Sequence, residues 1–216
     1  MSLPPVYLIF ITVSFVLSFR VYKQYNSELY LKLFPPYLGL SLAVEIVGIY
    51  LINIGARNYI IYNVFGVIEF AFFLFVLSKI IRKKSVQRII RVTLVLNALI
   101  STSNILFFQT GTYTSISYSI GSLLVVAFCI FYFFELFHYP KFIRLINEPS
   151  FWICSGLLFY FCCSFPLLGL TTLLEFTPPS LVRNAYILLN VMNCLLYTLF
   201  IIAFLCRVKI RKYISS

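Results

Sequence analysis

Residues 59–80 read YIIYNVFGVIEFAFFLFVLSKI, and a basic run, IRKK, ends at residue 84. As an α-helix this stretch extends about 33 Å, enough to cross the hydrocarbon core of a bilayer. It contains only two charged side chains, Glu69 and Lys79. The pattern therefore predicts a transmembrane helix that ends against a basic loop.

The composition of the whole chain supports the same interpretation. Hydrophobic residues make up 62% of the 216 residues and charged residues only 11%. Soluble proteins average about 45–50% apolar and about 25% charged residues, so this chain lacks the polar side chains to cover a soluble surface. The net charge of +11 comes from basic residues that lie between apolar runs. We therefore expect the lipid bilayer, and no nucleic acid, as the surrounding partner.

Seven apolar runs of this kind predict an all-α integral membrane bundle, formed by one transmembrane domain over residues 1–216. No loop between them is long enough to form a domain of its own. The first run has no basic residue before it and no small-residue cleavage site, so we expect an uncleaved helix rather than a signal peptide. The predicted helices cover residues 3–20, 34–55, 59–80, 89–109, 114–137, 150–173 and 184–206.

The basic residues set the expected orientation. Fifteen of them follow the odd-numbered helices, whereas only Arg57 and Arg183 fall on the other side. Basic loops stay in the cytoplasm, because moving their charge across the membrane is costly. We expect a protein of the cytoplasmic (inner) membrane, with its N-terminus outside and its C-terminus in the cytoplasm. The fifteen are Arg20, Lys23, Lys32, Lys79, Arg82, Lys83, Lys84, Arg88, Arg91, Lys141, Arg144, Arg207, Lys209, Arg211 and Lys212.

The residue types that common membrane enzymes require are scarce. The chain has one histidine, His138, and no aspartate. A retinal protein needs a lysine in its seventh helix, and the run 184–206 has none. A seven-helix zinc hydrolase needs clustered His and Asp ligands, and an intramembrane Ser-His protease needs a His at bilayer depth. We therefore expect a non-enzymatic protein with no metal site and no cofactor.

Two carboxyl groups lie at membrane depth. Glu45 and Glu69 are each about halfway along a predicted helix, and the short turn at 56–58 makes these helices antiparallel neighbours. Ionisable groups are costly at that depth and mark candidate functional sites. No basic side chain is available there, so we expect at least one of the two to be protonated at neutral pH. The pair is interpreted as a proton-linked site, an anchor for a ligand's amine, or a neutral hydrogen bond between helices.

Polar stripes accompany this pair. The runs 89–109 and 184–206 both repeat polar residues at spacings of three and four, which gathers them on one helical face. The stripes predict a polar cavity inside the bundle, open to the outside; the alternative is that they only hydrogen-bond the helices together. The candidate cavity residues are Glu45, Glu69, Asn63, Asn97, Ser101, Asn104, Asn190, Asn193 and Tyr197.

A short internal match suggests a duplication. Residues 59–66, YIIYNVFG, and residues 186–193, YILLNVMN, share Tyr, Ile, Asn and Val, and each opens a helix of the same direction. A three-plus-one-plus-three repeat would leave such a match, and transporters are often built from repeats. Together with Asn63 and Asn190 in the third and seventh helices, this topology resembles the PQ-loop and SWEET-like transporter families, although the chain has no Pro-Gln dipeptide.

Two further resemblances concern longer parts of the chain. The stretches EPSFWICSGLLFYFCCSFPLLGL at 148–170 and IIAFLCR at 201–207 resemble an uncharacterised family of small seven-helix membrane proteins from Bacteroidota. The topology is also similar to the seven-helix sensor region that precedes some bacterial histidine kinases. That similarity implies a free-standing sensor, with a cytoplasmic signalling protein such as a kinase docked on its basic face.

Three functions are compatible with these patterns. The leading hypothesis is a sensor- or receptor-like bundle that binds a small molecule or lipid and signals to a cytoplasmic partner. The second is a small-solute transporter, proton-coupled through Glu45 or Glu69. The third is a structural subunit of a larger membrane complex. The sequence leaves the ligand and the oligomeric state open.

Overall fold

The computed structural model describes residues 6–22, 28–109, 111–138, 145–169 and 179–214, and every regular element in them is a helix. The predicted all-α fold is confirmed. In chain order the elements are α1 (Tyr7–Ser18), η1 (Phe19–Val21), α2 (Leu29–Lys32), α3 (Phe34–Asn53), α4 (Tyr59–Ile80), α5 (Lys84–Ser103), η2 (Asn104–Phe108), α6 (Ser115–His138), η3 (Leu145–Asn147), α7 (Pro149–Gly169) and α8 (Pro179–Ile214).

Six stretches of the described chain are long and apolar enough to cross a membrane, which supports a multi-pass membrane protein. They correspond to the last six predicted helices. The first is shorter: the apolar stretch Tyr7–Val21 extends only about 22 Å at 1.5 Å per residue. The predicted run 3–20 begins among residues outside the described part. The six stretches are Leu29–Asn53, Tyr59–Ile80, Lys84–Phe108, Ser115–His138, Pro149–Leu167 and Arg183–Cys206.

Two helices extend well beyond their predicted apolar runs at the basic loops. α5 begins at Lys84 rather than at residue 89, and α8 continues to Ile214 rather than ending at residue 206. Hydropathy marks only the part of a helix that lies in hydrocarbon. Backbone hydrogen bonding continues past that boundary, where long basic side chains such as Lys84 and Arg88 reach water. The predicted boundaries were therefore too narrow at these ends.

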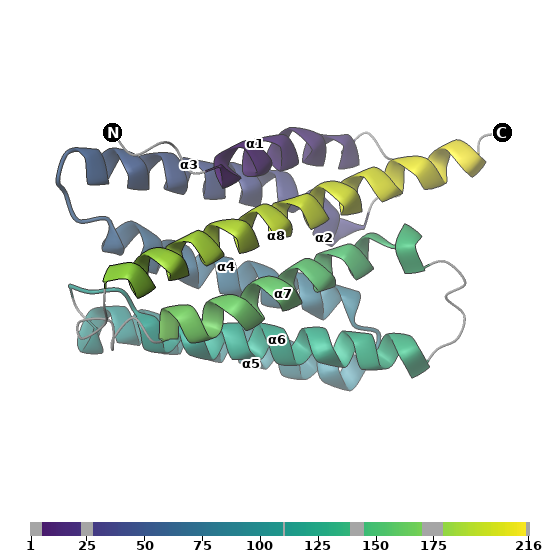
Figure 1. Ribbon diagram of the computed structural model, residues 1–216. Helices are drawn as coiled ribbons and strands as arrows, with labels where there is room; N and C mark the ends of the chain where they lie inside the picture. Colours follow the sequence, from purple (N-terminus) through teal and green to yellow (C-terminus); the bar gives the residue numbers. More distant parts are fainter. Residues whose placement is uncertain (1–5, 23–27, 110, 139–144, 170–178, 215–216) are drawn as a thin grey trace.

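Six helices form a closed ring in which α1 contacts α3, α3 contacts α4, α4 contacts α6, α6 contacts α7, α7 contacts α8, and α8 returns to α1. The first and last helices of the chain are thus neighbours, as Figure 1 shows. α5 lies outside this ring, against α4 and α6. The predicted three-plus-one-plus-three repeat stays a prediction.

The two ends of the bundle differ in charge. Because successive helices reverse direction, the turn between α4 and α5 and the C-terminal ends of α1 and α6 meet at one end, on the right in Figure 1. Most of the basic residues belong to this end, here named the basic end. The opposite end holds the turn at residues 54–58 and the residues that connect η2 to α6.

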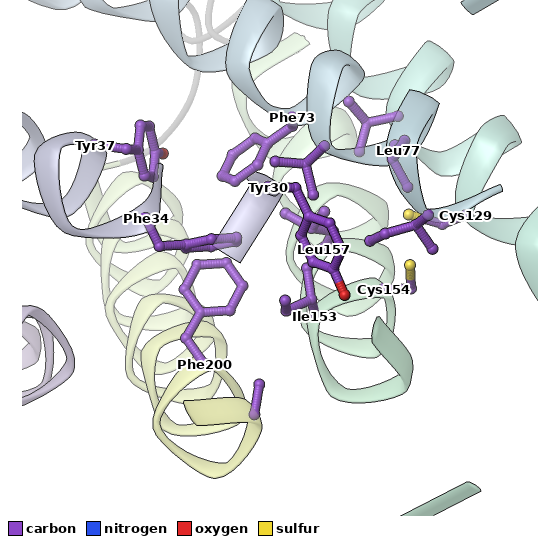
Figure 2. Packing of buried hydrophobic residues seen from close by; sticks show 14 of the residues in the cluster. Tyr30, Phe34, Tyr37, Phe73, Leu77, Cys129, Ile153, Cys154, Leu157 and Phe200 are labelled. Carbon is purple, nitrogen blue, oxygen red and sulfur yellow. The ribbon is translucent and has the colours of Figure 1, made fainter. Parts of the chain in front are cut away.

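Aromatic side chains fill the centre of the bundle toward the basic end. Phe34 of α3 lies edge-on to Phe72, Phe200 and Phe204, with ring centroids 5.1, 5.3 and 5.5 Å away. Figure 2 shows its ring between those of Phe73 and Phe200. In lipid, such close contacts rather than hydrophobic burial hold helices together. We name this set the aromatic layer: Phe34, Phe72, Phe73, Phe161, Phe200 and Phe204.

A buried carboxylate fixes the turn between α4 and α5 at the basic end. Glu135, near the end of α6, accepts hydrogen bonds from the backbone N–H groups of Arg82 and Lys83, each at 2.9 Å. Gln87 of α5 donates to the carbonyl oxygen of Ile81 at 2.7 Å. The carboxylate thereby accepts hydrogen bonds from backbone N–H groups just before α5, and the N-terminal end of a helix favours a nearby negative charge. No sequence pattern indicated this role for Glu135.

Candidate ligand-binding cavity

α1 and the six spanning helices all contribute to one cavity of about 560 Å³. Its volume lies within the range of about 300–1,000 Å³ that is typical of small-molecule sites. Each helix provides at least one polar lining residue. Examples in chain order are Tyr7, Glu45, Glu69, Ser101, Tyr118, Tyr160 and Tyr197.

The cavity begins at the opposite end and stops midway through the bundle. Asn58, Tyr113 and Thr114 line it near the loops of that end, and Phe70 lines it in the middle of α4. One helical turn further along α4 comes Phe73, which is fully buried in the aromatic layer. The aromatic layer therefore separates the cavity from the basic end.

Two tyrosines hold the carboxyl group of Glu45. Tyr7 of α1 and Tyr62 of α4 both donate to its Oε2 atom, at 2.6 and 3.2 Å. Glu45 itself belongs to α3, so this cluster joins three helices at the cavity wall. Hydrogen bonds from hydroxyl groups fix the position of the carboxyl group inside the bundle.

The second carboxyl group connects the cavity to the aromatic layer. Tyr37 of α3 donates to Glu69 Oε1 at 3.2 Å. The ring of Tyr37 stacks on Phe72, with centroids 4.0 Å apart and planes 6° apart. Tyr37 therefore contacts both Glu69 in the cavity wall and Phe72 in the aromatic layer.

Tyrosine is the most frequent residue type in the cavity wall. Tyr62 and Tyr113 lie at the opposite end, with ring centroids 6.3 Å apart and planes tilted by 45°. The hydroxyl group of Tyr113 donates to Asn58 Oδ1 at 2.7 Å, and partial burial raises the pKa of this phenol, which keeps it neutral. The seven lining tyrosines are Tyr7, Tyr62, Tyr113, Tyr118, Tyr160, Tyr186 and Tyr197.

Six of the nine predicted residues line this cavity: Glu45, Glu69, Asn63, Ser101, Asn193 and Tyr197. Ser101 is buried, and its Oγ atom has no hydrogen-bond partner. Asn63 is already engaged, because Nδ2 donates to the carbonyl oxygen of Thr112 and Oδ1 accepts from Thr114. Asn193 donates to the carbonyl oxygen of Leu189 on its own helix.

The other three predicted residues are not part of the wall. Asn104 donates to Gln109 and to Ser117 of α6, at 2.9 and 2.8 Å, and so ties the end of α5 to α6. Asn190 donates to the carbonyl oxygen of Tyr186. Asn97 is buried one turn from Ser101, toward the basic end. For Asn104, the interpretation as a contact between helices fits better than a role in the cavity.

The described part of the cavity wall has acidic but no basic side chains. None of the described residues that line it is Lys, Arg or His. No group of three or more metal-ligating side chains occurs in the part of the chain that the structure describes. The wall therefore offers carboxyl groups, hydroxyl groups and aromatic rings, which are groups that recognise and orient a ligand.

No family model matches the chain. A search of curated proteins and a search of solved structures found no match either. A functional inference for this protein therefore depends on the geometry of the cavity and of the two ends of the bundle.

Proposed function

We propose that this protein is a receptor-like membrane bundle that binds a small molecule in its cavity and signals to a protein at its basic end. One observation carries the proposal: all the long helices of the described chain converge on a single cavity that stops at the aromatic layer. A site with access from one end suits a protein that detects a ligand on one side of a membrane.

The charge distribution supports an orientation for this receptor. Under the positive-inside rule the basic end is cytoplasmic, so the cavity opens to the outside of the inner membrane. The exposed side chains of Arg82, Lys83, Lys84, Arg88 and Arg91 lie together around the start of α5. They offer a docking surface to an acidic partner. A signalling protein such as a kinase is the partner that the resemblance to kinase sensor regions suggests.

Tyr37 offers a way to connect the two ends. A ligand that takes over the hydrogen bond to Glu69 would release the hydroxyl group of Tyr37, whose ring lies on Phe72. Rearrangement of that ring changes the contacts of α3 with α4. A ligand shifts the equilibrium between two conformations only if it binds one of them more tightly than the other. The receptor therefore needs two conformations that differ in their contacts with the ligand.

A small-solute transporter is the second candidate, and the placement of α5 favours it. The six-helix ring consists of the first three and the last three long helices, and the fourth lies outside it. That arrangement is compatible with two three-helix repeats joined by a linker helix, as in repeat-built transporters. A transporter would require the aromatic layer to open toward the basic end in a second state.

Ligand binding and flux together test these proposals. Purified protein in nanodiscs is screened against a library of metabolites and lipids by thermal unfolding, because a ligand at 100 times its Kd stabilises a protein by about 2.7 kcal/mol. Hits are then tested for uptake into proteoliposomes. A receptor gives stabilisation without uptake, whereas uptake of a stabilising compound favours the transporter. Absence of any stabilising compound contradicts both candidates.

Two substitutions on α4 provide the matched control. A Cβ atom added at Gly66 meets open space, and Gly66 lines the cavity, so we expect the ring of Gly66→Phe to occupy the site. Val64 is half-exposed on the same helix and does not line the cavity. We expect Gly66→Phe to abolish ligand stabilisation and Val64→Phe to preserve it. Equal responses of the two variants would mean that the ligand binds elsewhere.

A further inference from the structure

We propose that the ligand of the cavity is an organic ammonium ion with an apolar body. This inference rests on the proposed binding function and names its ligand class. Four properties of the wall support it: its charge, its aromatic content, a buried hydroxyl group without a partner, and its apolar surface.

The charge of the wall favours a cation. Glu45 and Glu69 both line the cavity, and no described lining residue is basic. Two unit charges attract each other several times more strongly near protein than in bulk water, because the effective dielectric constant is lower. A cationic ligand would give these carboxyl groups the positively charged partner that none of the described lining residues provides, whereas an anion would be repelled.

The aromatic content favours an ammonium group. Tyrosine rings carry a negative face that attracts cations, and sites for quaternary ammonium groups are commonly built from several such rings. Seven tyrosines line this cavity. The hydroxyl groups of Tyr7 and Tyr62 are engaged with Glu45, so these two rings are held beside the carboxylate that the cation would approach.

Ser101 is an independent indication of a ligand. Its side chain is only 3% exposed, it lines the cavity, and its Oγ atom has no hydrogen-bond partner. An unpaired buried hydroxyl group destabilises the folded protein, and a ligand with a polar group can offset this cost. Since α5 lies outside the ring of six helices, Ser101 is the residue through which this helix contributes to the wall.

The remaining surface favours an organic ion over an inorganic one. Ile49, Ile52, Phe65, Val67 and Phe70 also line the cavity. These side chains do not coordinate a metal ion, but they cover the carbon skeleton of an amine. A cavity of about 560 Å³ also far exceeds the size of a bare ion.

The test compares cations with neutral molecules of the same shape. The full chain, in uncharged maltoside micelles, is titrated with choline against 3,3-dimethylbutan-1-ol, and with 2-phenylethylammonium against 2-phenylethanol. Binding is measured by calorimetry and by thermal unfolding. We expect at least one cation to bind, and its neutral counterpart to bind at least about tenfold more weakly, because the neutral molecule lacks the charge interaction.

Variants then locate the binding. Glu45→Gln and Glu69→Gln are each expected to weaken cation binding by about tenfold or more, since each removes a carboxyl group that can ionise opposite the bound cation. Glu28→Gln is the matched control, because Glu28 is exposed near the basic end and does not line the cavity. The comparison of isosteric probes on the unmodified chain does not depend on whether the glutamine variants fold.

Each outcome decides the ligand class. Cation selectivity that is lost in Gly66→Phe and kept in Glu28→Gln supports the proposal. Equal binding of charged and neutral probes overturns the ammonium class but leaves the proposed small-molecule site intact. Failure of both cations to bind also overturns it, as does stabilisation by sodium or potassium ions alone. If library compounds stabilise the protein in those cases, the binding function survives without this ligand class.

Discussion

The two halves of α4 have opposite roles. From Tyr62 to Glu69 the helix lines the cavity with tyrosine, asparagine, glycine and glutamate. From Phe70 to Ile80 it provides much of the buried core, including Phe73 and Leu77. Both halves are apolar enough to lie in one membrane span. Hydropathy thus places a helix in the membrane, while the small and polar residues within it decide where the bundle leaves space.

Substitutions that remove one phenylalanine ring from each half of α4 should lower the unfolding free energy by different amounts. Phe73→Ala removes a fully buried ring from the aromatic layer and should cost about 3–5 kcal/mol of unfolding free energy. Phe65→Ala, on the same helix, removes a ring that already borders the cavity, and should cost no more than about 2 kcal/mol. Unfolding by dodecyl sulfate in mixed micelles measures both. Equal losses would mean that the two halves pack alike.

A second substitution addresses the basic end. Glu135→Ala removes the acceptor of two backbone hydrogen bonds at the turn between α4 and α5. We expect a loss of about 2–3 kcal/mol, because the N–H groups of Arg82 and Lys83 lose a charged acceptor. Glu28→Ala, an exposed carboxylate near the same end, serves as the control in the same unfolding assay. A Glu135 variant no less stable than the control would contradict a structural role for this carboxylate.

A smaller effect tests the connection between the halves. Tyr37→Phe keeps the ring that stacks on Phe72 and removes the hydroxyl group that donates to Glu69. One hydrogen bond contributes about 1 kcal/mol to stability. In a double-mutant cycle with Glu69→Gln we expect a coupling energy of that order, since the two residues contact each other. Strict additivity of the two substitutions would show that the cavity and the aromatic layer are not connected through Tyr37.

Alanine substitutions at two glycines, Gly66 and Gly121, are expected to change the unfolding free energy only slightly and in opposite directions. A Cβ atom at Gly66 meets open space, so Gly66→Ala should stabilise the helix by about 0.5–1 kcal/mol. A Cβ atom at Gly121 would lie 2.7 Å from the ring of Phe70, which is buried, so Gly121→Ala should destabilise. Thermal unfolding of the two variants measures the difference. A loss of stability in Gly66→Ala would show that the cavity wall is filled at that point.

Much of the fold could be predicted from the sequence because the main signal is local. A run such as 59–80 needs only its own residues to predict a span, and α4 covers Tyr59–Ile80. The helix ends at the basic loops could not be predicted in this way, because interfacial residues such as Lys84 continue a helix outside the apolar run. The ring of six helices could not be predicted from the sequence either, since it depends on contacts between distant segments such as α1 and α8.

The candidate site was predictable only in part for a related reason. A carboxyl group in an apolar run, such as Glu45 or Glu69, stands out from its own neighbours, and both line the cavity. A polar stripe does not show which of its members reaches the interior. Ser101 lines the cavity, whereas Asn104, three residues later, lies in the π-helical turn η2 and bonds to Ser117. The seven lining tyrosines come from five helices and from the segment before α6, and only Tyr197 was among the predicted cavity residues, because the others share no local pattern.

Labelling of Ser101→Cys shows from which side of the membrane the cavity is accessible, in a variant whose six native cysteines are replaced. The reagent is a membrane-impermeant methanethiosulfonate with a trimethylammonium group, added to intact cells or to inside-out vesicles. If the cavity opens only to the outside and accepts ammonium groups, position 101 reacts in intact cells and not from the cytoplasmic face of vesicles. Reaction from the cytoplasmic face alone, or no reaction from either side, would contradict a cavity that opens to the outside and accepts ammonium groups.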